Sequence, residues 1–153
     1  MRKSLAAVSI VLLLFLSGCL AHMRATNVAT DLNYQAAMQE NPYRWFVVDL
    51  EGDRAALEQR LIGDVASSKA TDSKKQTILS KLEELEAKNG RTTKPNLKEV
   101  RILPPAFLIS VTSKVTEAWV LDSGGKEVVY TIEHAPGTKD EEFKVKGPWQ
   151  KRS

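Results

Sequence analysis

Few side chains in this sequence have the types and spacing needed for metal binding or nucleophilic chemistry. The single cysteine is Cys19, and the two histidines are His22 and His134. A zinc or transition-metal site draws on several nitrogen and sulfur ligands, or on a dense carboxylate cluster. Glu133-His134 could supply only part of one, and we interpret His134 as a surface residue at a strand end. We therefore predict no metal site and no cofactor.

The motifs of common hydrolases and phosphate-binding proteins are also missing from the sequence. Serines are frequent, but none stands in a Gly-x-Ser-x-Gly nucleophile elbow. Gly124-Gly125 is better explained as a turn than as a phosphate loop, and Asp140-Glu141-Glu142 as a solvated acidic loop. We predict no catalytic residues and a protein that is not an enzyme. The alternative is an enzyme of unrecognised class, with acidic residues, His134 and Tyr130 gathered in one cleft.

The tryptophans and the basic C-terminal segment are the other candidate binding features. We interpret Trp45 and Trp119 as core residues, because both lie in apolar strand-like runs. An aromatic residue among basic ones suits an anionic membrane surface or a partner groove. The alternative is a tail that its tryptophan packs back onto the domain. The candidate contact residues are Trp149, Lys144, Lys146, Lys151 and Arg152.

The first 19 residues have the pattern of an export signal. Arg2 and Lys3 precede a nearly unbroken apolar run over residues 5–16. As a helix this run rises about 18 Å, well short of a hydrocarbon core of ~30 Å. It therefore favours a signal peptide over a membrane-spanning helix.

Leu16-Ser17-Gly18-Cys19, which closes this run, resembles the lipobox of bacterial lipoproteins. The resemblance covers residues 1–19 and implies cleavage before Cys19, whose sulfur would carry a diacylglycerol. In Gram-negative members, Asp after the Cys retains the protein in the inner membrane. Leu20 at that position implies the periplasmic face of the outer membrane, if the host is Gram-negative. The alternatives are an ordinary secretory signal, with Cys19 incidental, and an uncleaved single-span anchor.

The length and composition of the rest of the chain indicate one domain of near-neutral charge. Removing residues 1–18 from the 153 leaves 20 basic and 19 acidic residues, a net charge of +1. Such a domain has no general field for phosphate backbones, so we exclude nucleic acid as a partner. With Cys19 acylated, no thiol remains for a disulfide, and stability must come from packing.

The helical predictions for the mature chain begin after a short tether over residues 20–30. Extended, this tether would reach about 36–40 Å. Residues 31–41 fit a short helix that ends at Asn41-Pro42. Residues 53–67 read as a helix with Leu57, Leu61 and Val65 on one face. A second helix is predicted from a capping box at Ser73 to the stop at Asn89-Gly90, and the two should form an antiparallel hairpin.

Strand-like runs account for most of the remaining chain. Residues 44–50 are apolar on both faces, which predicts a central strand. After residue 96 the apolar period changes to two. This change predicts strands around residues 100–102, 107–112, 115–121, 128–132 and 142–146, with Pro104-Pro105 as a rigid bend. The expected fold is α+β, with a helical hairpin packed on a mostly antiparallel sheet of about four to five strands. The expected domains are 1–18 as signal peptide, 19–30 as lipidated N-terminus and tether, and 31–153 as a single α+β domain.

These observations predict a lipid-anchored cell-envelope protein, held on the membrane through Cys19. We expect a non-enzymatic accessory, assembly or exclusion factor that binds an envelope protein partner near the membrane. The alternative is a periplasmic binder or carrier of a small apolar or lipid-like ligand.

Overall fold

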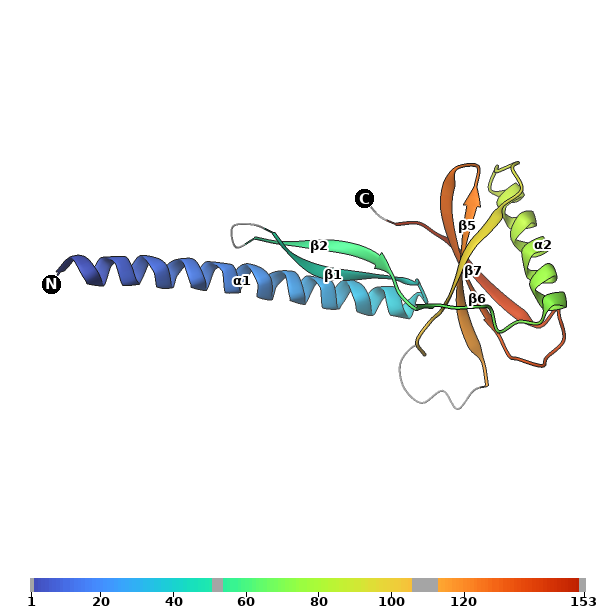
Figure 1. Ribbon diagram of the computed structural model, residues 1–153, viewed down its shortest axis with the longest axis horizontal. Helices are drawn as coiled ribbons and strands as arrows, with labels where there is room; N and C mark the ends of the chain where they lie inside the picture. The colour runs from blue at the N-terminus through green and yellow to red at the C-terminus, as the bar shows by residue number, and fades with distance from the viewer. Residues whose placement is uncertain (1, 51–53, 106–112, 152–153) are drawn as a thin grey trace.

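The computed structural model describes residues 2–50, 54–105 and 113–151, and their side chains at residues 20–49, 54–105 and 113–151. Within these ranges the chain forms two helices and seven strands (Figure 1). Their order is α1 (Arg2–Met38), β1 (Tyr43–Leu50), β2 (Arg54–Leu61), β3 (Asp64–Val65), α2 (Asp72–Lys88), β4 (Asn96–Ile102), β5 (Val115–Ser123), β6 (Lys126–His134) and β7 (Phe143–Trp149). The predicted α+β class is confirmed.

The larger sheet has five strands in the order β3-β4-β5-β6-β7, and every neighbouring pair is antiparallel. Strands β5 and β6 form the predicted hairpin, with Trp119 opposite Tyr130. Their two-residue loop is Gly124-Gly125, and both glycines have positive φ. Positive φ at both positions suits the two-residue hairpin turn whose twist matches that of the strands. The same conformation is costly for residues other than glycine. Strand β7 is the predicted edge strand and carries Lys144 and Lys146.

Helix α2 is the predicted second helix, with a different N-cap. Thr71 caps it by accepting a hydrogen bond from the Lys74 backbone N–H at 3.2 Å. The N-cap therefore lies two residues before the expected Ser73. At the C-terminus, Gly90 has φ +78° and the Arg91 N–H donates to the Glu86 carbonyl at 2.9 Å. This is the left-handed ending that Asn89-Gly90 predicts.

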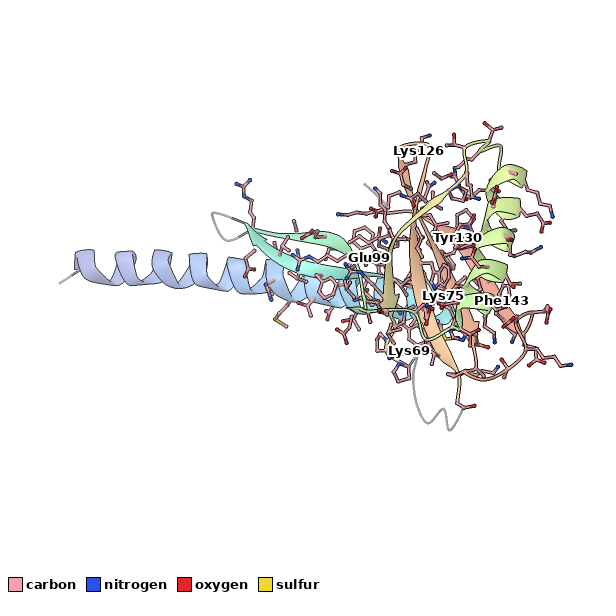
Figure 2. The ribbon with its side chains drawn as sticks, turned by 45° about the vertical axis from the view of Figure 1, so that its right-hand side comes forward. Lys69, Lys75, Glu99, Lys126, Tyr130 and Phe143 are labelled. Atoms are coloured by element: carbon pink, nitrogen blue, oxygen red, sulfur yellow. The ribbon has the colours of Figure 1, made fainter. Side chains whose placement is uncertain are left out.

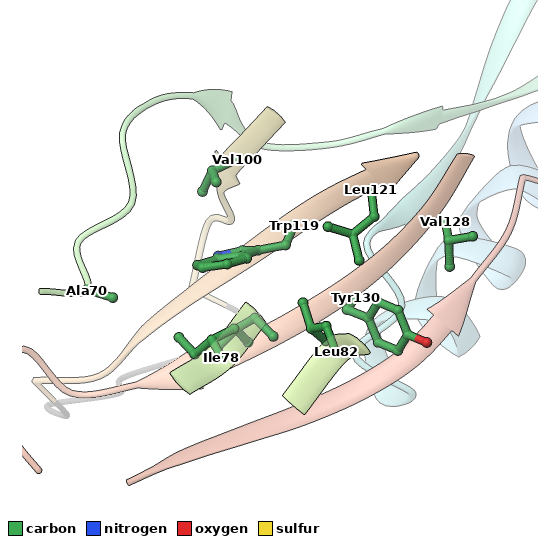
Figure 3. Packing of buried hydrophobic residues seen from close by; sticks show 9 residues of the cluster. Ala70, Ile78, Leu82, Val100, Trp119, Leu121, Val128 and Tyr130 are labelled. Carbon is green, nitrogen blue, oxygen red and sulfur yellow. The ribbon is translucent and has the colours of Figure 1, made fainter. Parts of the chain in front are cut away.

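Helix α2 covers one face of the five-stranded sheet, and the main core lies between them (Figure 3). Ile78 and Leu82 of the helix are fully buried against Trp119, Leu121 and Tyr130. Each such side chain contributes about 1.5–3 kcal/mol by burial. The prediction that Trp119 is a core residue is confirmed.

A smaller apolar cluster lies on the reverse face of the sheet. Ala118, Val120 and Val129 project from β5 and β6, and Tyr43 at the start of β1 packs on them. Leu61, Leu103 and Trp149 border the cluster. This contact joins the β1–β2 hairpin to the larger sheet.

The helix predicted over residues 53–67 is wrong, because residues 54–61 form strand β2. β2 pairs along its whole length with β1, from Tyr43 opposite Leu61 to Leu50 opposite Arg54. The same residues also alternate, with Leu57, Gln59 and Leu61 on one face and Glu58 and Arg60 on the other. Pairing with the aromatic and β-branched β1 overrides the helical propensity of β2. The two helices of the structure therefore do not form a hairpin.

Strand β1 confirms the predicted strand over residues 44–50, but the prediction of a central position is wrong. It belongs to a two-stranded sheet that lies alongside α1 (Figure 1). Trp45 is half-buried, not a full core residue, and Phe46 is 40% exposed on the other face. The Arg60 guanidinium lies over the Phe46 ring at 5.5 Å from its centroid.

Residues 20–30, for which we expected a short tether, are helical and lie within α1. Ala29 and Ala36 are buried, and their small side chains suit close packing against the β1–β2 hairpin. The Asn33 side chain donates to the Trp45 carbonyl at 2.8 Å and accepts from the Trp45 N–H at 2.6 Å. The helix ends at Met38, where Glu40 has φ +56° and turns the chain into β1.

The strand predicted over residues 107–112 lies outside the described residues. Val100 and Ile102 belong to β4, as the alternation predicts. The short β3 pairs with the outer edge of β4, through Asp64 opposite Ile102.

Candidate functional site

A cleft of about 920 Å³ lies where α1 ends against the larger sheet. Its walls come from the last turns of α1, the segment entering β1, and the adjacent ends of β4 and β5. Its apolar lining includes Ile62, Ile102, Leu103, Pro104, Pro105 and Val115. The volume is near the upper end of the range of about 300–1,000 Å³ found for ligand sites.

Arg44 is the charged residue of the cleft that has no acidic partner. Its Nη1 donates to the backbone carbonyls of Asn41 and Tyr43, the latter at 2.9 Å. No carboxylate among the described residues forms an ion pair with it. Burial lowers the pKa of the Arg44 guanidinium, which remains fully charged at neutral pH.

The other charges that line the cleft are paired. Lys114 Nζ lies 2.9 Å from Glu133 Oε1, and Glu40 Oε1 lies 2.6 Å from Lys146 Nζ. The Lys114 ammonium is the main reason that the pKa of Glu133 lies below its usual value. Arg44 is therefore the charged lining residue that has no oppositely charged partner among the described residues.

Two asparagines fix the backbone around Arg44. Asn41 Oδ1 accepts a hydrogen bond from the Tyr43 N–H at 2.9 Å, which shapes the turn into β1. The Asn33 side chain forms hydrogen bonds with both the carbonyl and the N–H of Trp45 that face away from β2. The hydroxyls of Tyr34 and Thr116, which also line the cleft, make no hydrogen bond within the described residues.

The predicted contact residues of the C-terminal segment do not gather at one surface. Trp149 packs beside the reverse-face cluster, with Nε1 3.5 Å from Thr131 Oγ1, which matches the alternative of a tail held by its tryptophan. Lys146 and Lys144 both lie beside the cleft, because Lys146 pairs with Glu40 and Lys144 lies 3.8 Å from Glu133, and both carboxylates line the cleft. Lys151 is exposed, and Arg152 lies outside the described residues.

The predicted lipidation residue, Cys19, lies within the span of α1, but its side chain is outside the described residues. His22, three residues later, contacts Asp49 of β1, with Nδ1 and Oδ1 3.2 Å apart. This places the Asp49 end of the β1–β2 hairpin beside the part of α1 that follows Cys19.

The prediction that His134 is a surface residue is wrong. Its side chain is fully buried, with Nε2 3.3 Å from Glu117 Oε1, and neither ring nitrogen makes a hydrogen bond within the described residues. Residues 20–49, 54–105 and 113–151 contain no group of three His, Cys, Asp or Glu side chains that could hold a metal ion.

Glu117 is a buried carboxylate that sequence reasoning treated as an ordinary strand residue. It accepts hydrogen bonds from Ser68 Oγ at 2.7 Å, the Lys69 N–H at 2.6 Å and Trp119 Nε1 at 2.7 Å. These bonds hold the segment before α2 against β5. The period of two, which puts Glu117 on the same strand face as Trp119 and Leu121, is the sequence signal that could have indicated its burial.

A second buried carboxylate, Glu86, joins α2 to the sheet. It accepts from Arg91 Nη1 at 2.7 Å and from the Tyr130 hydroxyl, which lies between the sheet and α2 (Figure 2). Burial raises the pKa of Glu86, but the hydrogen bonds of its neighbours outweigh this effect and the net pKa is lowered. Burial and the Glu86 carboxylate raise the pKa of Tyr130. Both buried clusters are closed by internal partners, so we interpret them as structural.

The acidic loop at Asp140 makes a specific contact. Asp140 accepts hydrogen bonds from Ser73 Oγ and, at 3.4 Å, from Thr71 Oγ1 at the start of α2. An acceptor there suits the unpaired N–H groups and dipole of a helix N-terminus. The loop therefore braces α2, although the contact is exposed.

The core cluster around Trp119 occupies the space between α2 and the five-stranded sheet. The cleft beside Arg44 is elsewhere, on the α1 side of the molecule.

No helix in the described part of the chain is both long and apolar enough to cross a membrane. The sequence matches no protein-family model, no curated protein and no solved structure.

Proposed function

We propose that this protein is a lipid-anchored envelope protein, attached through Cys19, that binds a protein partner near the membrane without catalysing a reaction. The lipobox-like Leu16-Ser17-Gly18-Cys19 supports the anchor. Two or more acyl chains hold a protein stably on a bilayer without a spanning helix. The outer membrane is the proposed location if the host is Gram-negative.

The observation that carries the proposal furthest is the packing of α1 on the β1–β2 hairpin. The contacts of His22 with Asp49 and of Asn33 with Trp45 hold the two together over much of their length. From Cys19 to Met38 the helix rises about 30 Å. An anchor at Cys19 would then hold the five-stranded sheet and the cleft at a defined height above the lipid surface. A fixed height suits recognition of a partner held in the same envelope.

Lipid attachment is tested by replacing the acylated sulfur. Cys19→Ser should abolish incorporation of labelled palmitate and slow removal of residues 1–18. Ser17→Ala keeps a small residue in the lipobox and serves as the processed control. Palmitate incorporation or removal of residues 1–18 that is unchanged in Cys19→Ser would refute the anchor.

The cleft favours one alternative, a binder of a small apolar or lipid-like ligand. Its wall of Ile62, Ile102 and Leu103 would suit a hydrocarbon chain. Native mass spectrometry of protein from envelope extracts distinguishes the two functions. A copurifying small molecule that is lost on Ile102→Glu would favour the alternative, whereas a bound polypeptide would favour the partner-binding function.

A further inference from the structure

The Arg44 guanidinium has hydrogen-bonding capacity that the described residues do not use. A guanidinium carries five N–H donors. The backbone carbonyls of Asn41 and Tyr43 both accept hydrogen bonds from Nη1 of Arg44. The Nε and Nη2 donors have no acceptor among the described residues. This unused edge has the fork geometry that binds a carboxylate through two parallel hydrogen bonds.

The surroundings of Arg44 favour an anionic group that is attached to apolar chemistry. Lys114 is paired with Glu133, and Glu40 is paired with Lys146, which lies outside the lining, so Arg44 is the charged lining residue without an oppositely charged partner among the described residues. The apolar part of the lining comes from Ile62, Ile102, Leu103 and two prolines. The prolines have no backbone N–H. The cleft is much larger than a carboxylate alone would fill.

Two features of the cleft favour a peptide over a hydrocarbon chain. The Tyr34 and Thr116 hydroxyls make no hydrogen bond within the described residues and can bond the polar groups of a peptide backbone. The cleft also begins at Thr30 on α1, which is about 16 Å along the helix from Cys19. With the proposed anchor at Cys19, the cleft lies that far along α1 from the acyl chains.

We propose that this cleft binds the apolar C-terminal end of a partner protein, with Arg44 receiving the terminal carboxylate. Capture of a chain end by fixed donors beside an apolar wall is a known mode of peptide recognition. The proposal rests on the partner-binding function above and specifies its site. Arg44 supplies the charge, and Ile62 and Ile102 contact the last apolar side chains of the peptide.

The test uses the full acylated chain in lipid nanodiscs, labelled with ¹³C at the isoleucine methyl groups. The probes are the peptide acetyl-Ser-Ala-Leu-Val with a free carboxylate and the same peptide amidated. We expect the free acid to shift the Ile62 and Ile102 signals, to leave the buried Ile78 signal unchanged, and to bind at least about tenfold more tightly than the amide. Arg44→Gln should remove that preference, and Arg44→Lys should restore only part of it.

Arg60→Gln, on the same hairpin but outside the cleft, is the matched control and should keep the preference. If Arg44→Gln does not fold, the comparison of acid with amide on the unaltered protein decides alone. Equal binding of acid and amide, no shift of Ile62 or Ile102, or an Arg44-dependent response to laurate without one to peptide would each overturn the proposal. Recovery of a crosslinked partner by Arg44→Gln as well as by the unaltered chain would overturn this site while leaving the partner-binding function intact.

Discussion

Glu117 and His134 are neighbouring buried polar residues with opposite hydrogen-bonding situations. Glu117 accepts three hydrogen bonds, whereas the His134 ring nitrogens make none within the described residues. Removing an acceptor leaves its buried donors unpaired, which costs free energy, whereas replacing an unpaired polar group by an apolar one costs little. The two residues should therefore differ strongly in their effect on stability.

We predict that Glu117→Leu lowers the free energy of unfolding by about 3 kcal/mol or more, because Ser68, Lys69 and Trp119 lose their acceptor. His134→Leu should change it by less than about 1 kcal/mol. Urea unfolding followed by tryptophan fluorescence measures both. A loss for His134→Leu as large as that for Glu117→Leu would instead indicate an ion pair between the two residues.

The lowered pKa of Glu86 predicts acid sensitivity. Its carboxylate has a pKa below the 4.5 of the unfolded chain, so it stabilises the fold fully above pH 4.5. This contribution is lost as the pH falls through the folded-state pKa. Glu86→Gln should lower stability at neutral pH by about 3 kcal/mol, because Arg91 loses a buried partner, and should flatten the loss of stability below pH 4.5.

Unfolding free energies measured between pH 7 and pH 2 test this prediction. Glu83→Gln is the control on the same helix, because its exposed carboxylate makes only a loose 3.7 Å pair with Lys94. A pH profile for Glu86→Gln that parallels the unaltered protein would contradict the assigned role.

At the scale of elements, the attachment of the β1–β2 hairpin to α1 depends on one side chain more than on others. Asn33 satisfies both outward backbone groups of Trp45, where a neighbouring strand would otherwise be needed. Asn33→Ala should lower stability by about 1–3 kcal/mol and speed amide hydrogen exchange at Trp45. Asn27→Ala, on an exposed position of α1, should leave exchange at Trp45 unchanged. Equal exchange in the two variants would show that the hairpin is held by other contacts.

The elements that sequence analysis located correctly are those whose local signals agree with their tertiary contacts. In α2 the apolar positions Ile78 and Leu82 and the Asn89-Gly90 stop all point to one helix. In β5 and β6 the period of two and the Gly124-Gly125 turn point to one hairpin. Strand β2 failed this test, because its leucines fit a helical stripe and a strand equally well. Only its pairing with β1 decides between them.

At the scale of the whole molecule, the candidate site could not be read from the sequence. The cleft brings together residues from α1, β1, β4 and β5 that are far apart in the chain. Nothing in the local sequence marks Arg44 as different from other arginines. Its distinction lies in partners supplied by the fold: carbonyls on one nitrogen and no carboxylate among the described residues. The one local signal for which we propose a function, the lipobox-like Leu16-Ser17-Gly18-Cys19, predicts location and not binding.

The central claim is that an anchor at Cys19 presents the cleft to a protein partner. It is tested most directly by a photo-crosslinking amino acid in living cells, placed at Tyr34, which lines the cleft and is 60% exposed. Lys81, an exposed residue of α2, is the control position. We expect one discrete crosslinked product from position 34, none from position 81, and loss of that product in Cys19→Ser. No product from either position, the same product from both, or full retention in Cys19→Ser would contradict the claim.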